Sequence, residues 1–507
     1  MYSTYLNQKG DIMKSTQILI AIALLCIFSL ITPSFSGSHV SFIPRKETLD
    51  TISPSVNEEL SLAITSPRCS APAYTALNET ITIDFTVPFF DHVYFTLATA
   101  YESIVDTIEL PLTHLTHDDC WTATVSIPLH TPPELYNLTV TIVHNGRLYA
   151  ATEPRAVNVV SAFSENISFI HITNFHVGDP RGFLESIQET LGFRSIIRCI
   201  DEINLLHPDF VVISGDLVFG QLYPGEYARE YPWCYEMLQR FDVPTYLAPG
   251  NHDGYFRIGE DGLEFWDHYF GDRYYSFNIG PYHFQAINSF DMPKLLRFSV
   301  LFLALNWGGY ITDEQLDWIE QDLDASESLA TFLFMHHNPL WETTQDSLIR
   351  LPYKNRQELL DIIDDHEVDM VLAGHVHYDN VTTVNDTVFV TTTTPESEIR
   401  VDDGYWGYRL IEVTDGNITR YNYKEPKYSI PSYHLSATVI NPYAITLNNE
   451  LEQSLPILLE FFVPYGNYTV NQGEILLQRQ QEFLQQVYVR LNSPAQSELT
   501  VTLTPQS

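Results

Sequence analysis

Basic residues are scarce in this chain. Its 507 residues include only 26 Lys and Arg against 64 Asp and Glu, which gives a formal net charge of -38. Such a surface repels the phosphate backbone of a nucleic acid, so a general nucleic-acid-binding protein is excluded. The acidity favours solubility and identifies no particular cationic partner.

Long apolar runs are also scarce. The main one, residues 18–31, follows Lys9 and Lys14 and precedes Ser34 and Ser36, which form a small-x-small cleavage pattern. The run is shorter than the roughly 20 residues that a membrane span needs. It predicts a signal peptide over residues 1–36 and a secreted or cell-surface protein. An uncleaved membrane anchor through residues 18–31 is the alternative.

Cysteine is rare as well. Beyond Cys26 there are four cysteines, an even number that suits an oxidising exterior. Their order along the chain predicts disulfides between Cys69 and Cys120 and between Cys199 and Cys234, with buried free thiols as the alternative. Export also predicts a glycoprotein, and sequons occur at Asn78, Asn137, Asn166, Asn380, Asn385, Asn417 and Asn467.

The composition is that of a folded protein, with 45% hydrophobic and 18% charged residues. The length exceeds what one hydrophobic core usually serves, so we expect several domains. Residues 51–163 contain short alternating runs such as TITIDFTV and YNLTVTIV, which predict a β-sandwich. Residues 428–507 return to short runs such as LEFFV and VYVRL, which predict a second β-domain. The stretch GEILLQRQQEFLQQ within it fits a helix or a long strand.

Between these regions, residues 166–425 alternate buried strands with helical stretches. SFIHIT and FVVISGD read as strands, and FLESIQETLGFRSIIRCIDEINLL has helical periodicity. Polar residues repeatedly fall just past the carboxyl ends of the predicted strands. In open α/β sheets that edge is where ligands bind.

Five strand-end motifs carry the chemistry. Each alone could be an exposed turn, but together they supply imidazole, carboxylate and amide oxygen, which are ligands for divalent cations such as Zn, Mn and Fe. The motifs are N174-F-H176, G215-D216, G250-N251-H252-D253, H336-H337 and G374-H375-V376-H377.

In this order the motifs resemble those of the calcineurin-like metallophosphoesterase family, DxH, GDxx(D/N), GNH(D/E), a His after a strand, and GHxH. The resemblance spans roughly residues 167–423. It implies a four-layer αββα sandwich, here flanked by two mostly-β domains. It also implies metal-dependent hydrolysis of a phosphomonoester or phosphodiester by a metal-bridged hydroxide.

The resemblance also assigns roles to the motif residues. It implies two divalent metal ions, Mn, Zn or Fe, bridged by Asp216, and makes Asp216 and His252 the catalytic residues and Asn251 and His252 the substrate-binding residues. His252 would protonate the leaving oxygen or stabilise the phosphoryl group. One metal would take Asn174, His176, Asp216 and His377, and the other Asp216, Asn251, His336 and His375. His337 would be a neighbour.

Two positions depart from the family pattern. Asn174 stands where the family has Asp, and Phe219 stands where purple acid phosphatases, a related branch, have tyrosine. An amide in place of a carboxylate removes a negative charge and weakens the first metal site. The alternatives are a dinuclear enzyme with a weaker first metal, an enzyme that uses the second metal alone, or a non-catalytic exported metal-binding, phosphate-binding or adhesion protein. The other motif residues are all present, which favours an enzyme.

Three further features carry hypotheses. Asp179 could replace the charge missing at position 174, although a loop aspartate before Pro180 is the simpler interpretation. Arg181 could meet a phosphate. The apolar segment 295–310 fits either a buried cap or an apolar lip that accepts a lipid phosphate or touches a membrane.

Overall fold

The computed structural model describes most of the chain beyond the N-terminal region. The described residues form one compact unit by their contacts. Among the described residues no helix is long and apolar enough to cross a membrane. The predicted signal peptide 1–36 lies outside them, and export stays a prediction. The described residues are 56–57, 60–99, 107–179, 186–221, 224–300, 303–304, 308–341, 352–396, 406–425, 427–480 and 484–506.

The first strands form two sheets with one shared core. Alternation places Ile81, Ile83 and Phe85 of β4 inside, whereas its threonines, Thr80, Thr82 and Thr86, face outward. One sheet has the order β1 (Val56–Asn57), β2 (Leu62–Ser66), β4 (Thr80–Thr86), β8 (Trp121–Ser126), β7 (Leu112–His117). The other has the order β3 (Ala73–Ala76), β10 (Arg147–Val160), β9 (Glu134–His144), β5 (His92–Thr99), β6 (Ile108–Leu110). Apolar side chains of both sheets form the core between them.

Two larger sheets follow in the middle of the chain. The first has the order β13 (Thr245–Ala248), β12 (Phe210–Ser214), β11 (Asn166–Ile172), β24 (Gly407–Thr414), β25 (Asn417–Arg420), with β26 (Ile430–Pro431) beside β24. The second has the order β16 (Tyr275–Ile279), β17 (Tyr282–Ile287), β20 (Ala330–Met335), β21 (Met370–Ala373), β23 (Thr387–Thr391), β22 (Asn380–Val384). Two separate two-stranded sheets lie in the same part of the chain, β14 (Phe256–Arg257) with β15 (Glu260–Asp261) and β18 (Ser299–Val300) with β19 (Leu303–Ala304).

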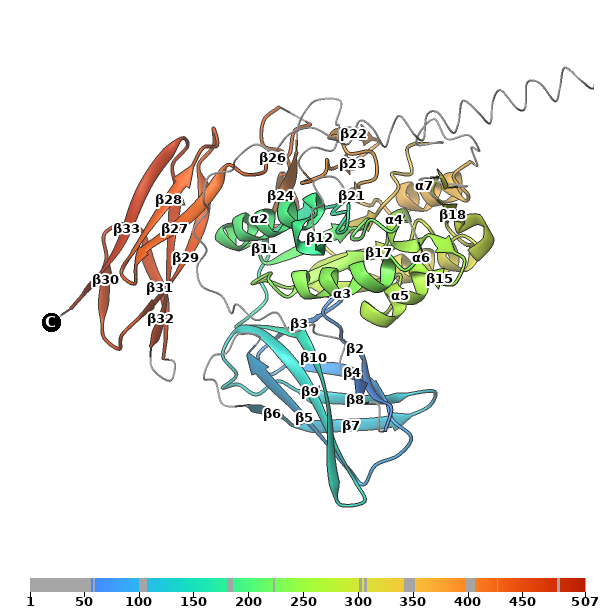
Figure 1. Ribbon diagram of the computed structural model, residues 1–507, viewed down its shortest axis with the longest axis horizontal. Coiled ribbons are helices and arrows are strands. Elements are labelled where there is room, and N and C mark those ends of the chain that lie inside the picture. Colours follow the sequence, from blue (N-terminus) through green and yellow to red (C-terminus); the bar gives the residue numbers. More distant parts are fainter. Residues whose placement is uncertain are drawn as a thin grey trace, which may run out of the picture. The chain divides into compact units, whose positions relative to one another are not determined.

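The two sheets pack face to face and helices cover their outer faces. Phe169 of β11 contacts Phe284 of β17 and Phe332 of β20 at ring-centroid distances of 5.6 Å. Outside the first sheet lie α2 (Leu191–Leu206), α3 (Tyr227–Leu238) and α5 (Gly262–Tyr269), and outside the second lie α6 (Asp313–Ala325) and α7 (Arg356–Asp365). Short helical turns are η1 (Ile187–Glu189), α4 (Asn251–Gly254) and η2 (Lys294–Arg297). The predicted αββα sandwich with flanking β regions is confirmed (Figure 1).

The last strands form two more sheets, coloured orange to red in Figure 1. One has the order β27 (Leu435–Asn441), β28 (Ala444–Asn449), β33 (Ser497–Pro505), β30 (Tyr468–Val470), and the other has the order β29 (Leu455–Val463), β32 (Gln485–Ser493), β31 (Glu474–Gln480). The stretch that fitted a helix or a strand contributes β31 and the start of β32. Buried residues of these sheets share an apolar core with α2.

The predicted disulfides are wrong for this structure, because all four cysteines it describes are free thiols. Cys69, Cys199 and Cys234 lie in the apolar core that contains α2 and α3, whereas Cys120 lies in the turn between β7 and β8. The pairing by sequence order failed because buried cysteines act here as small apolar side chains. Burial raises the pKa of the Cys199 and Cys234 thiols well above their usual value.

Glu202 of α2 forms hydrogen bonds with two sheets, the one that contains β24 and the one that contains β27. Its carboxyl accepts hydrogen bonds from Tyr408 Oη of β24 at 3.1 Å and from Leu435 N of β27 at 3.4 Å. Burial raises the pKa of this carboxyl to about 8. Between the pKa of the unfolded chain and this value, only the folded state holds the proton. The free energy of unfolding therefore falls as pH rises through that window.

Glu202→Gln is expected to remove this dependence, since glutamine stays neutral and keeps an acceptor. At pH 8.5 the variant should be more stable than the unchanged chain by about 4 kcal/mol, whereas at pH 4.5 the two should differ little. Urea unfolding of both proteins between pH 4.5 and 8.5 measures the difference. If the free energies of unfolding of the two proteins differed by the same amount at every pH in this range, the assignment of the proton to Glu202 would be contradicted.

Candidate metal centre

The five motifs follow strands that point the same way. β11, β12 and β13 are parallel neighbours in one sheet, and β20 and β21 are parallel neighbours in the other. Their carboxyl ends therefore meet at one edge of the sandwich. The structure places every residue of the sequence-predicted site at that edge, on the turns that follow these strands: Asn174, His176, Asp216, Asn251, His252, His336, His375 and His377.

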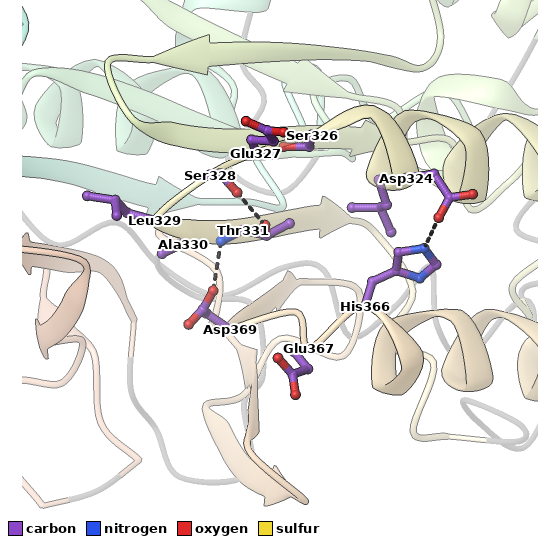
Figure 2. A pocket seen from close by; sticks show the side chains of 11 residues that line it. Asp324, Ser326, Glu327, Ser328, Leu329, Ala330, Thr331, His366, Glu367 and Asp369 are labelled. Carbon is purple, nitrogen blue, oxygen red and sulfur yellow. Dashed lines mark hydrogen bonds and ion pairs between the residues drawn. The ribbon is translucent and has the colours of Figure 1, made fainter.

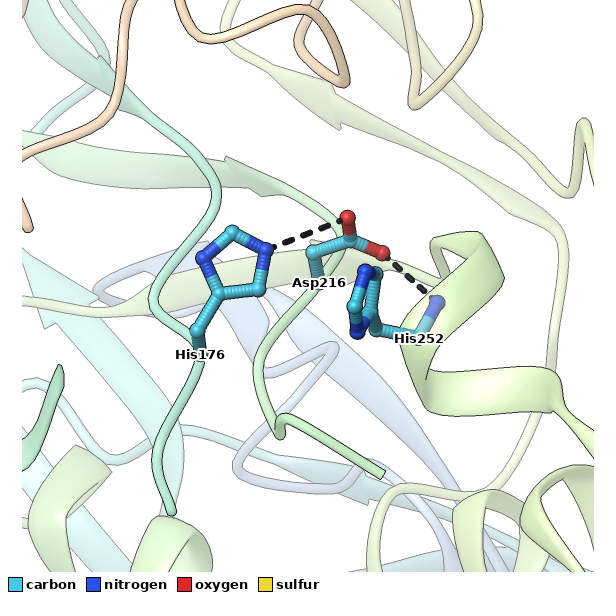
Figure 3. A group of neighbouring side chains, drawn as sticks. All are labelled: His176, Asp216 and His252. Atoms are coloured by element: carbon cyan, nitrogen blue, oxygen red, sulfur yellow. Dashed lines mark hydrogen bonds and ion pairs between the residues drawn. The ribbon is translucent and has the colours of Figure 1, made fainter. Parts of the chain in front are cut away.

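Asp216 lies at the middle of the cluster. Ligand-type atoms of Asp216, His176 and His252 lie within 4.8 Å of one another, and so do those of Asp216, His336 and His375. Figure 3 shows the first group around the carboxylate. Asp216 is the residue common to both groups. A carboxylate has two oxygens, so it can serve two cations at once.

The turn that carries Asp216 is held by a second carboxylate. Asp216 has a φ of 56°, and its N–H donates to Asp253 Oδ2 at 2.8 Å. Asp253 also accepts from the N–H groups of Leu217 and Gly250, each at 2.8 Å. A Cβ at position 250 would collide with Asp216, so glycine is required there. The hydrogen bonds to Asp253 thus stabilise the left-handed backbone conformation of Asp216, which fixes the position of its carboxylate.

His176 is oriented by Glu396. Its Nδ1 lies 3.0 Å from Glu396 Oε2, and its Nε2 lies 3.5 Å from Asp216 Oδ2. An Nδ1–H that donates to Glu396 leaves a lone pair on Nε2, which is the usual tautomer of a metal-binding histidine. Burial would lower the pKa of His176, but the contacts with Asp216 and Glu396 raise it to about 10. These carboxylates thus favour positive charge at this position, as a metal cation would supply.

His336 and Asn251 present ligand atoms in the same way. His336 donates from Nδ1 to Ser214 O at 2.7 Å, and its Nε2 lies 3.0 Å from Asp216 Oδ2. Asn251 donates from Nδ2 to Tyr255 Oη at 2.6 Å. Its Oδ1 is buried and has no hydrogen-bond partner among the described residues. Because a buried acceptor without a partner is costly, this donor set fits a cation.

His375 and His377 complete the cluster. The His375 ring lies 5.1 Å from that of His336, and the His377 ring lies 4.9 Å from that of His176. Burial lowers the pKa of both imidazoles well below the usual value, so both are neutral at pH 7. The group of atoms within 4.8 Å around His176 contains His252, where the resemblance implied His377.

His252 faces Asp216 from α4. Its backbone N–H donates to Asp216 Oδ1 at 2.8 Å, and its Nδ1 lies 2.5 Å from Phe219 O. The carbonyl can only accept, so Nδ1 carries the proton and Nε2 is the open atom. Burial lowers the pKa of His252 to about 4. Phe219 packs its ring 5.4 Å from that of His252 and offers no phenol oxygen to a metal.

Asn174, which departs from the family pattern, has its side-chain oxygen in contact with the backbone. The side chain is buried, and its Oδ1 accepts a hydrogen bond from His375 N at 3.2 Å. The oxygen that would bind the first metal is therefore engaged by the backbone. Nδ2 is buried without a hydrogen-bond partner in the described part of the chain.

The remaining hypotheses have mixed outcomes. Asp179 is buried just beyond His176, and its N–H donates to His176 O at 2.9 Å. Its replacement of the missing charge stays a prediction. Arg181 lies outside the described residues, as does part of the segment 295–310. Arg297 in that segment is buried and donates from Nη1 to Asp261 Oδ1 at 2.6 Å. His337 lies beside the cluster, with Nδ1 2.9 Å from Ser289 Oγ.

Sequence reasoning missed Glu396 and the support from Asp253 and Tyr255. Asp253 is the last residue of the GNHD motif, so the sequence already placed a carboxylate next to the predicted ligands. Glu396 stands in the stretch TTTTPE after β23, and its position past a strand end was the available signal.

A surface cavity of 480 Å³ lies at the opposite end of β20. Two of its contacts are drawn in Figure 2: Asp369 Oδ2 accepts from Thr331 N at 2.7 Å, and His366 Nε2 lies 3.1 Å from Asp324 Oδ1. The first joins the segment before β21 to β20, and the second joins the end of α7 to the end of α6, so we assign the cavity a structural role.

The chain resembles known phosphoesterases. The sequence model of the calcineurin-like phosphoesterase family matches residues 167–379. The chain is 26% identical over 212 residues to the probable glycerophosphodiester phosphodiesterase of Arcobacter nitrofigilis, which covers 41% of this chain and 72% of that protein. It is 28% identical over 222 residues to a 3',5'-cyclic-nucleotide phosphodiesterase of Nostoc, with 42% and 71% covered. It is 28% identical over 243 residues to a serine/threonine-protein phosphatase of Bos taurus, with 45% and 71% covered.

Proposed function

We propose that the chain is a metal-dependent phosphoester hydrolase that acts on phosphodiesters at the Asp216 cluster. The match of residues 167–379 to the calcineurin-like phosphoesterase family supports this proposal. The observation that carries the site assignment is that Asp216 belongs to two groups of ligand-type atoms, each within 4.8 Å. One carboxylate shared by two donor sets suits a pair of cations.

We assign the metal ligands to the side chains around Asp216. His176 and His377 would hold one ion with Asp216, and Asn251, His336 and His375 would hold the other. The imidazole, carboxylate and amide donors suit Zn, Mn or Fe. Two such ions lower the pKa of a water molecule and offset the negative charge of the phosphoryl oxygens.

The chain's own groups would do the rest of the chemistry. Glu396 and Ser214 O fix the tautomers of His176 and His336, and Tyr255 turns the oxygen of Asn251 toward the cluster. His252 keeps its proton on Nδ1 against Phe219 O, so Nε2 is the atom that takes or gives a proton beside the scissile P–O bond. The role of His252 is proton movement and contact with the phosphoryl group, without a covalent intermediate.

The substrate class rests on the relatives. Two of the three relatives above are described as phosphodiesterases, and the third as a protein phosphatase. We therefore place diesters first and monoesters second.

The protein loaded with Mn, Zn or Fe should hydrolyse bis(4-nitrophenyl) phosphate with a kcat/KM about tenfold or more above that for 4-nitrophenyl phosphate. A chelator should abolish both activities. Preference for the monoester would overturn the diester assignment. No turnover of either ester by the metal-loaded protein would favour the alternative, an exported metal-binding or phosphate-binding protein.

Export and glycosylation remain proposals. They are supported by the apolar run 18–31 and by the sequons, since each of the seven sequon asparagines is exposed or partly exposed. Membrane association through 18–31 or 295–310 also stays a prediction.

A further inference from the structure

We propose that Asn174 is a hydrogen-bond donor to a phosphoryl oxygen of the bound substrate and is not a ligand of the first metal. The proposal rests on the phosphoesterase function above and concerns the same site. It gives Asn174, which departs from the family pattern, a role in substrate binding.

The orientation of the amide follows from its neighbours. Oδ1 accepts from His375 N at 3.2 Å. Rotating the amide by half a turn would set Nδ2 against this N–H, so two donors would face each other. The side chain is therefore held with its oxygen on the His375 turn, and Nδ2 is left buried and unpartnered among the described residues.

The backbone holds the amide in this place. Asn174 N donates to Gly215 O at 3.0 Å, and Asn174 O accepts from Thr394 Oγ1 at 2.8 Å. The residue has a φ of 58°, a conformation that asparagine and aspartate tolerate better than other side chains with a Cβ. Its turn also carries His176, which belongs to one of the two groups that share Asp216, and its oxygen contacts the backbone of His375, which belongs to the other.

Charge decides what an N–H at this position can bind. A cation is repelled by an amide N–H, whereas a phosphoryl oxygen accepts from it. With asparagine at position 174, Asp216 is the one anionic ligand of the metal beside His176. The site therefore repels a bound phosphate less than a site with two carboxylates would. A preorganised donor of this kind stabilises negative charge that builds up on the phosphoryl group.

The test uses Asn174→Ala and Asn174→Asp in the metal-loaded protein, with inorganic phosphate as the probe. Asn174→Asp is the matched variant, because it keeps the acceptor for His375 N and the shape of the side chain. We expect both variants to bind phosphate about tenfold or more weakly by titration calorimetry at saturating metal. We expect Asn174→Ala to bind as many metal equivalents as the unchanged protein.

Two results would overturn the proposal. Loss of one metal equivalent in Asn174→Ala would make Asn174 a ligand. Unchanged phosphate affinity in Asn174→Asp would show that phosphate does not need the Nδ2–H donor. Thermal unfolding shows whether each variant is folded. If Asn174→Ala is not folded, the phosphate affinity of Asn174→Asp tests the proposal. Neither readout depends on turnover, so a failure of the diesterase proposal is seen separately, in the assay of the unchanged protein.

Discussion

Asp216→Asn is expected to lower kcat/KM for bis(4-nitrophenyl) phosphate by about 10³-fold or more, the largest loss expected of any single substitution here. The change removes the negative charge that both groups share. It keeps the shape of the side chain and an oxygen for the N–H of His252, and asparagine tolerates the φ of 56° at this position. The expected cause is loss of metal, so elemental analysis should find fewer metal equivalents in the variant.

The matched control is Asp369→Asn. Asp369 lies just before β21 of the second sheet. Like Asp216, it accepts a backbone hydrogen bond, from Thr331 N at 2.7 Å, but at the end of β20 opposite the cluster (Figure 2). Its kcat/KM should stay within about twofold of the unchanged protein. If Asp216→Asn kept kcat/KM within tenfold, the shared carboxylate would not be the centre of the site.

His252→Gln should give the second-largest effect, a fall in kcat of about 10² to 10⁴-fold with the metal content unchanged. The variant keeps the backbone N–H that donates to Asp216 but loses the ring nitrogen that moves a proton. Single-turnover measurements at saturating metal separate this loss from weaker substrate binding.

The metal content of His252→Gln also tests the ligand assignment. The ligand-type atom of His252 lies within 4.8 Å of those of His176 and Asp216, so the geometry alone would allow it to bind a cation. A missing metal equivalent in His252→Gln would make His252 a ligand and contradict its role in proton movement.

The αββα fold was predictable because its periodicities are strong. SFIHIT and FVVISGD, which are rich in apolar residues, become the buried strands β11 and β12, and the helical stretch between them contributes α2. Parallel strands place their carboxyl ends at one edge, so the residues after them could be collected into one site before any geometry was known.

What could not be predicted depends on contacts between distant segments. Glu396 is 220 residues from His176 and follows no spacing rule, so only the folded sheet brings the two together. The cysteine pairing failed for the same reason, since the distance between thiols is set by packing and not by order. The engagement of Asn174 Oδ1 by His375 N spans 201 residues and was equally invisible.

The central claim is that Asp216 serves two metal ions at once. Elemental analysis of the full chain after loading with Mn, Zn or Fe and removal of free metal tests it most directly, with bis(4-nitrophenyl) phosphate hydrolysis followed on the same samples. The account predicts two metal equivalents per chain and turnover that is lost when they are removed. One equivalent with full turnover, or turnover that survives complete removal of metal, would contradict it.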